Sequence, residues 1–63
     1  MTWELYEVWA EDESGHEELV DTTKSIKEAR QLAKRSLGDW ALAATIYKET
    51  GDGYYEVVEK VKR

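Results

Sequence analysis

The sequence predicts a single α+β domain, residues 1–63, with ββαββ order: two β-hairpins joined by one helix. Three observations support this prediction. Segments rich in aromatic and β-branched residues flank turn signals, an amphipathic segment at helical spacing separates them, and 63 residues can build only one small core. We expect a four-stranded antiparallel sheet in the spatial order 2-1-3-4, with the order 2-1-4-3 as the alternative.

The first hairpin begins with a strand predicted over residues 3–10, because aromatic and branched side chains follow one another there without a turn former. The polar segment that follows ends at Gly15, which can adopt a positive φ, so it is expected to form the hairpin loop. The returning strand, about residues 16–22, has only Leu19 and Val20 as apolar residues. Its many acidic side chains suit an edge strand.

A helix is predicted over residues 25–37. Ser25 and Glu28 have the spacing of a capping box, in which each side chain bonds a free backbone N–H. Gly38 stands where a left-handed residue would end the helix. The apolar residues fall on one stripe that would pack on the sheet: Ile26, Ala29, Leu32, Ala33 and Leu37.

The second hairpin combines a strand over residues 40–48, a turn over 50–53 and a last strand over 54–61. Alanines in the first of these segments would also allow a helix, but its later β-branched and aromatic residues favour a strand. Two glycines and an aspartate give the turn a strong signal.

One helix can cover only one face of such a sheet, so the other face, here called the open face, is expected to carry apolar residues. The first strand can present either set of alternate residues to the helix. The set of Tyr6, Val8 and Ala10 is favoured, since this keeps Glu7 out of the core, and the opposite orientation would place Trp3 and Trp9 in the core instead. In the third and fourth strands, the residues expected to face the helix are Trp40, Leu42, Ala44, Ile46, Tyr55, Val57 and Val61. The open face would then carry Trp3, Leu5, Trp9, Ala41, Ala43, Thr45, Tyr47, Tyr54 and Val58.

A contiguous apolar patch rich in tryptophan and tyrosine is typical of a binding interface. The sequence therefore predicts protein binding through the open face. Sheet-on-sheet packing of two copies would bury the same patch, so a homodimer is expected as one form of this binding. The residues predicted to carry it are Trp3, Leu5, Trp9, Tyr47, Tyr54 and Val58.

Charge is distributed unevenly along the chain. Residues 1–23 carry eight acidic side chains and no lysine or arginine, whereas residues 24–37 carry five basic side chains against one glutamate. The acidic first hairpin therefore favours a basic protein surface as partner. The net charge of −5 argues against nucleic-acid binding, which needs clustered cations. No segment has the character of a signal peptide or a membrane span, so a cytoplasmic protein is expected.

No catalytic residue, metal site or cofactor is predicted. The chain has no cysteine, and its single histidine, His16, belongs to the acidic hairpin loop without the ligand series of a calcium loop. The sequence thus favours a non-catalytic interaction module that self-associates or binds another protein. An alternative is an engineered or designed scaffold without a natural function, suggested by the absence of proline and cysteine. A third hypothesis is an acidic mimic of nucleic acid.

Overall fold

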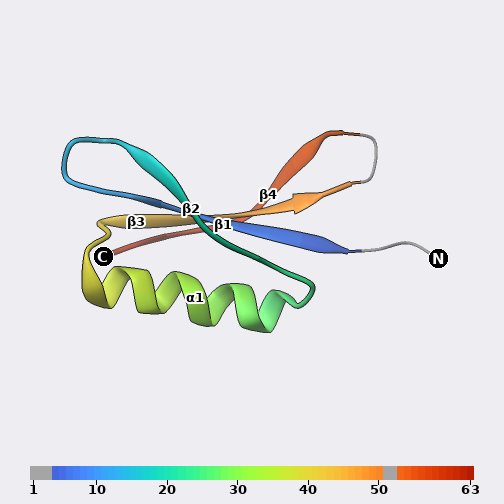
Figure 1. The fold of residues 1–63 in the computed structure, drawn as a ribbon, viewed down its shortest axis with the longest axis horizontal. Helices are drawn as coiled ribbons and strands as arrows, with labels where there is room; N and C mark the ends of the chain where they lie inside the picture. The colour runs from blue at the N-terminus through green and yellow to red at the C-terminus, as the bar shows by residue number, and fades with distance from the viewer. Residues whose placement is uncertain (1–3, 51–52) are drawn as a thin grey trace.

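A computed structural model describes residues 4–50 and 53–63 and confirms the predicted ββαββ order (Figure 1). The strands form one antiparallel sheet in the order β2-β1-β3-β4, which is the first of the two predicted orders. The helix lies along one face of this sheet. The elements are β1 (Leu5–Glu11), β2 (Glu17–Thr23), α1 (Ile26–Asp39), β3 (Ala43–Glu49) and β4 (Tyr55–Lys62).

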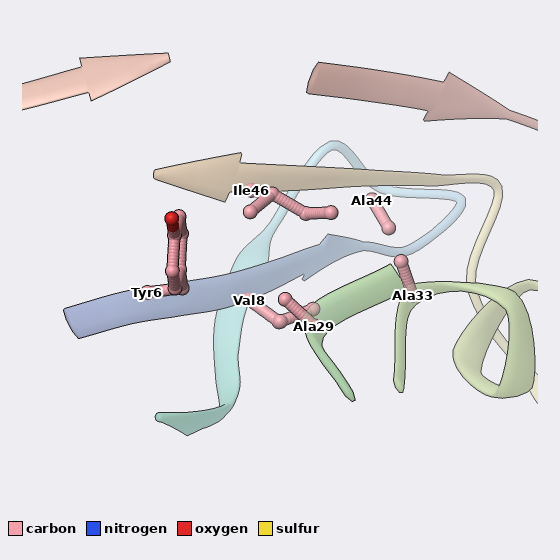
Figure 2. Packing of buried hydrophobic residues seen from close by; sticks show 6 residues of the cluster. All are labelled: Tyr6, Val8, Ala29, Ala33, Ala44 and Ile46. Carbon is pink, nitrogen blue, oxygen red and sulfur yellow. The ribbon is translucent and has the colours of Figure 1, made fainter. Parts of the chain in front are cut away.

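The core lies between α1 and the two central strands. Tyr6 and Val8 of β1 are buried in one cluster with two alanines of α1 and with Ile46 of β3, and Figure 2 shows Val8 beside Ala29. The predicted orientation of β1 is therefore confirmed, with Glu7 outside the core. The predicted helix stripe is confirmed as well: its two alanines are buried, and its larger residues pack around the cluster.

The start of α1 differs from the predicted capping box. Ser25 is the N-cap residue, but its side chain makes no capping hydrogen bond, so that prediction is wrong. Instead, the Thr23 hydroxyl donates to the Ser25 carbonyl at 2.8 Å and accepts the Ser25 N–H at 3.3 Å. A buried threonine at the end of β2 therefore holds the turn into the helix.

The end of α1 also differs from the prediction. The helix continues through Gly38 and Asp39, and Gly38 does not have a positive φ. The N–H groups of Trp40 and Ala41 both donate to the Ser36 carbonyl, at 3.1 and 2.9 Å. These bonds satisfy a terminal carbonyl of the helix without a left-handed glycine.

The connection from α1 to β3 places three residues differently from the prediction. Because β3 begins at Ala43, Trp40 and Leu42 lie outside the strand, and each is 39% exposed instead of facing the helix. Ala41, expected on the open face, is fully buried in this connection. The Leu42 backbone is nevertheless held, since its N–H donates to the Glu11 carbonyl at 2.8 Å.

A β-bulge in β4 changes which of its side chains face the helix. Ile46 pairs with Glu59, but the next residue, Tyr47, pairs with Val57. Val58 is therefore an extra residue without a partner in the register. The alternation of side chains on β4 is reversed between the two ends of the strand.

The bulge corrects the predicted orientation of β4. Tyr55 and Val57 were expected to face the helix, but their pairing places them on the open face with Tyr47. Val61 lies opposite Ala44 and does belong to the helix side, as predicted. Tyr54, expected on the open face, precedes β4 and is 72% exposed, and Val58 lies at the bulge itself.

Candidate functional site

The open face, the side of the sheet opposite α1, is partly covered by its own side chains. The central residue Thr45 is only 5% exposed although no helix packs over it. Its neighbours across the two strand pairs are Trp9 and Lys60, both long enough to lie over it. Eight residues of the two central strands belong to this face: Leu5, Glu7, Trp9, Glu11, Ala43, Thr45, Tyr47 and Glu49.

A pocket of about 300 Å³ opens on this face, and five of the described residues line it. Glu17 and Tyr55 stand at the loop ends of the two hairpins, both of which rise on the side away from α1 (Figure 1). The other lining residues belong to the central strands, where Glu7 lies directly opposite Tyr47. The aromatic–acidic pocket, as we call it, consists of Glu7, Trp9, Glu17, Tyr47 and Tyr55.

A hydrogen bond fixes the relative position of a ring and a carboxylate in the pocket. The Trp9 indole Nε1–H donates to Glu7 Oε1 at 2.9 Å. The two residues are two positions apart on β1 and therefore share one face of the sheet. Both are half-buried, so the bond satisfies an indole N–H that is partly removed from water.

The carboxylates of the pocket create a negative electrostatic potential, which affects the pKa of Tyr55. The negative charge of Glu7, hydrogen bonding to Glu7 and the charge of Glu49 raise the pKa of the Tyr55 hydroxyl above its ordinary value. Deprotonation of Tyr55 would add another anion beside these carboxylates. The same field would favour a cation placed in the pocket.

Two ion pairs of the described residues lie away from the pocket. Lys48 contacts Glu4 at 3.3 Å between Nζ and Oε1, and Arg30 contacts Glu59 at 3.4 Å between Nε and Oε2. Across residues 4–50 and 53–63, these two pairs do not involve a pocket carboxylate. Glu17 instead lies directly opposite another acid, Glu11, on β1. Like charges at opposed positions of two strands destabilise the pairing.

The acidic hairpin loop is a separate feature and has a structural role. Asp12 Oδ1 accepts hydrogen bonds from the Ser14 N–H and hydroxyl, at 2.9 and 2.7 Å, and from the His16 N–H at 3.1 Å. The Asp12 pKa is lowered, mainly by the hydrogen bond from the Ser14 hydroxyl. Gly15, with φ of +84°, completes the turn. Among the described residues, no group of three or more His, Cys, Asp or Glu side chains is arranged to hold a metal ion.

The structure brings together only part of the predicted set. Trp9 and Tyr47 line the pocket, whereas Leu5 shares the open face without lining it. Tyr54 and Val58 do not line the pocket either. Trp3 lies outside the described residues.

Sequence reasoning missed Glu7, Glu17 and Tyr55 as pocket residues. The sequence does indicate the position of Glu7. It precedes Trp9 by two residues in the same strand, so both side chains must point to the same face of the sheet. Tyr55 could not be placed in this way, because its position depends on the bulge at Val58.

Comparisons with protein-family models, curated proteins and solved structures found no match to this chain. Within the described ranges, no helix has the length and apolar character that crossing a bilayer requires.

Proposed function

We propose that this protein is a non-catalytic interaction module that binds a basic segment of another protein on the open face of its sheet. The observation that carries this proposal is the pocket in which Trp9, Tyr47 and Tyr55 stand beside two carboxylates. Tryptophan and tyrosine dominate the binding energy of many interfaces. Aromatic faces and carboxylates both attract cations, so one basic side chain can gain from both.

The sheet edges are less suited to partner binding than the open face. Both edge strands carry a bulge, at Val20 in β2 and at Val58 in β4. A bulge interrupts the row of free backbone groups and increases the local twist, which hinders the addition of another strand. These features support contact through side chains of the open face.

The chemistry of the pocket supports binding more than catalysis. The described residues of its lining offer carboxylates and tyrosine hydroxyls but no histidine, serine or lysine. Glu7 already accepts the Trp9 indole N–H, and Glu17 is exposed to solvent. A general acid or base normally needs an environment that tunes its pKa, such as a water-excluding cavity.

A second copy of the chain is the other candidate partner, and the charge pattern of the open face favours it. Lys62 and Glu17 lie in one row across the sheet, at its β4 and β2 sides respectively, because both pair through Ala43 and Glu11. Two sheets packed face to face about a two-fold axis parallel to the strands would place Lys62 of each copy over Glu17 of the other. The proposed homodimer would therefore be electrostatically self-complementary.

Amide chemical-shift mapping with a decapeptide of alternating lysine and glycine tests the proposal. We expect saturable shifts at open-face residues, and none with a matched glutamate–glycine peptide. Tyr55→Ala should weaken binding, whereas Tyr54→Ala, a change to the adjacent exposed tyrosine outside the pocket, should not. Shifts confined to α1, or equal binding of both peptides, would contradict the proposal. Sedimentation equilibrium distinguishes the second candidate: a concentration-dependent dimer that Glu17→Lys dissociates supports self-association.

A further inference from the structure

We infer that the aromatic–acidic pocket receives the ammonium end of one lysine side chain, with the aliphatic stem of that lysine lying against the rings of Trp9, Tyr47 and Tyr55. This inference rests on the proposed function and specifies the chemistry that the pocket recognises. It concerns a single anchoring residue of the partner, in contrast to the overall attraction between an acidic face and a basic segment.

The pocket has room for one long side chain. Its volume of about 300 Å³ is at the lower end of the range for ligand pockets, roughly 300–1,000 Å³. Lysine is an aliphatic chain that ends in a compact charge. The aromatic rings can cover the stem, and the same rings attract the ammonium group, most strongly at tryptophan.

Among the described residues that line the pocket, none carries a positive charge that would balance its carboxylates. Glu17 of β2 lies directly opposite Glu11 of β1. The charge of Glu7 raises the pKa of the Tyr55 hydroxyl. An ammonium group between Glu7 and Glu17 would reduce the repulsion among these carboxylates. The charge complementarity thus selects a cation over a neutral apolar anchor such as leucine.

The geometry at Glu7 favours lysine over arginine. Oε1 of Glu7 already accepts the Trp9 indole N–H at 2.9 Å. A guanidinium that binds a carboxylate as a fork needs one lone pair on each oxygen at the same time, and the bond from the indole to Oε1 leaves fewer arrangements in which both are free. An ammonium group needs only one free lone pair of the carboxylate, so it can bind Glu7 beside the Trp9 indole and the Tyr55 hydroxyl without displacing either.

Three capped pentapeptides test the inference: Gly-Gly-Lys-Gly-Gly and its counterparts with arginine and norleucine at the centre. The Trp9 indole N–H resonance reports on the pocket directly, because Trp9 lines it. We expect a saturable shift with the lysine peptide, at least threefold weaker binding of the arginine peptide, and no saturable shift with the norleucine peptide. Binding should also weaken with added salt, since charges on an open surface are screened.

Matched variants locate the binding. Glu17→Gln and Tyr55→Ala should each weaken binding of the lysine peptide about tenfold, whereas Glu18→Gln and Tyr54→Ala, at adjacent positions outside the pocket, should leave it unchanged. Equal affinity for the lysine and norleucine peptides, or equal effects of the paired variants, would overturn the inference. If the alternating decapeptide still bound the open face in that case, the proposed function would stand and only the lysine anchor would fail. Absence of binding by every peptide would overturn both.

Discussion

Trp9 Nε1–H donates a 2.9 Å hydrogen bond to Oε1 of Glu7, which precedes it by two residues on β1. The bond fixes an aromatic ring and a carboxylate side by side on the open face before any partner arrives. A cation would then meet the ring and the negative charge in an arrangement that already exists. Such preorganisation lowers the entropy lost on binding.

The link between Glu7 and Tyr55 gives a first prediction. Glu7→Gln should lower the Tyr55 pKa toward its ordinary value, because the charge of Glu7 is the main cause of the raised pKa. Carbon-13 NMR of the tyrosine rings as a function of pH measures this directly. Glu4→Gln is the control, since Glu4 interacts with Lys48 and Tyr6, whose pairing puts them on the opposite face. An unchanged Tyr55 titration in Glu7→Gln would show that the two groups do not interact.

The core gives a second prediction. Ile46→Ala should destabilise the protein by about 2–5 kcal/mol, because Ile46 is fully buried and its loss leaves a cavity. A single core of this size rarely supplies more than about 3–5 kcal/mol, so the variant should be largely unfolded at 25 °C. Urea unfolding followed by circular dichroism measures the change. Val57→Ala, at a position 58% exposed, should change stability by less than about 0.5 kcal/mol. Similar effects of both changes would contradict the assigned core.

The sequence was sufficient to predict the elements of the fold and their order, whereas it left two orientations open for β1. The position of Glu7 favoured the orientation of β1 that the structure has, with Tyr6 and Val8 buried, but Leu5 and Trp9 make the other face of this strand apolar as well. The orientation of β4 could not be read in the same way, since Tyr54, Tyr55, Val57 and Val58 place apolar side chains on both faces of a strand. Only strand pairing reveals which residue is the bulge.

The candidate site was predictable to a smaller extent. Aromatic composition singled out Trp9 and Tyr47, which do line the pocket. Glu17 and Tyr55 come from different hairpins, and the twist that brings both toward one pocket depends on the whole sheet.

The start of the helix was also not predictable from local sequence alone. Thr23, the last residue of β2, holds the turn in place of the predicted capping side chain of Ser25.

The cluster of Glu4, Tyr6 and Lys48 gives a third prediction, on pH. Hydrogen bonds from Lys48 and Tyr6 lower the Glu4 pKa in the folded protein, the Lys48 bond being the larger cause. The ionised carboxylate therefore stabilises the fold at a pH above the ordinary glutamate pKa, and this contribution is lost as the pH falls through the lowered folded-state pKa. The difference in Tm between the protein and Glu4→Gln should accordingly shrink to nothing in strong acid.

Thermal unfolding between pH 7 and pH 2 checks this dependence. Glu13→Gln, in the exposed hairpin loop, should leave the Tm unchanged at each pH. A Tm difference between the protein and Glu4→Gln that stays constant over the whole range would contradict the assigned interaction.

The bulge in β4 gives a fourth prediction. Deletion of Val58 should keep Tyr55 and Val57 on the open face, because the pairs Ile46–Glu59 and Tyr47–Val57 would then follow one another regularly. It should also leave a flatter edge with a continuous row of free backbone groups, which favours strand-to-strand association. Sedimentation velocity should therefore detect larger species in the deletion variant than in Val58→Ala, which keeps the chain length. A deletion variant that stays as monodisperse as Val58→Ala would show that the bulge does not protect this edge.

The opposed pair Glu11 and Glu17 gives a fifth prediction, in which stability and binding change in opposite directions. Glu17→Lys converts a repulsive cross-strand pair into an attractive one and should stabilise the fold by about 0.5 kcal/mol. The same change introduces a positive charge at the pocket and should abolish binding of the lysine peptide. Glu18→Lys provides the control, because Glu18 pairs with Ala10 on the other face and does not line the pocket.

The opposite signs separate a functional carboxylate from an incidental one. If Glu17 were only a solvated edge residue, Glu17→Lys and Glu18→Lys would change peptide binding equally through net charge. If Glu17 stabilised the hairpin, its replacement would lower the urea midpoint instead of raising it. A higher urea midpoint together with lost binding, seen for Glu17→Lys and absent for Glu18→Lys, is the result expected when a residue is retained for binding at a cost in stability.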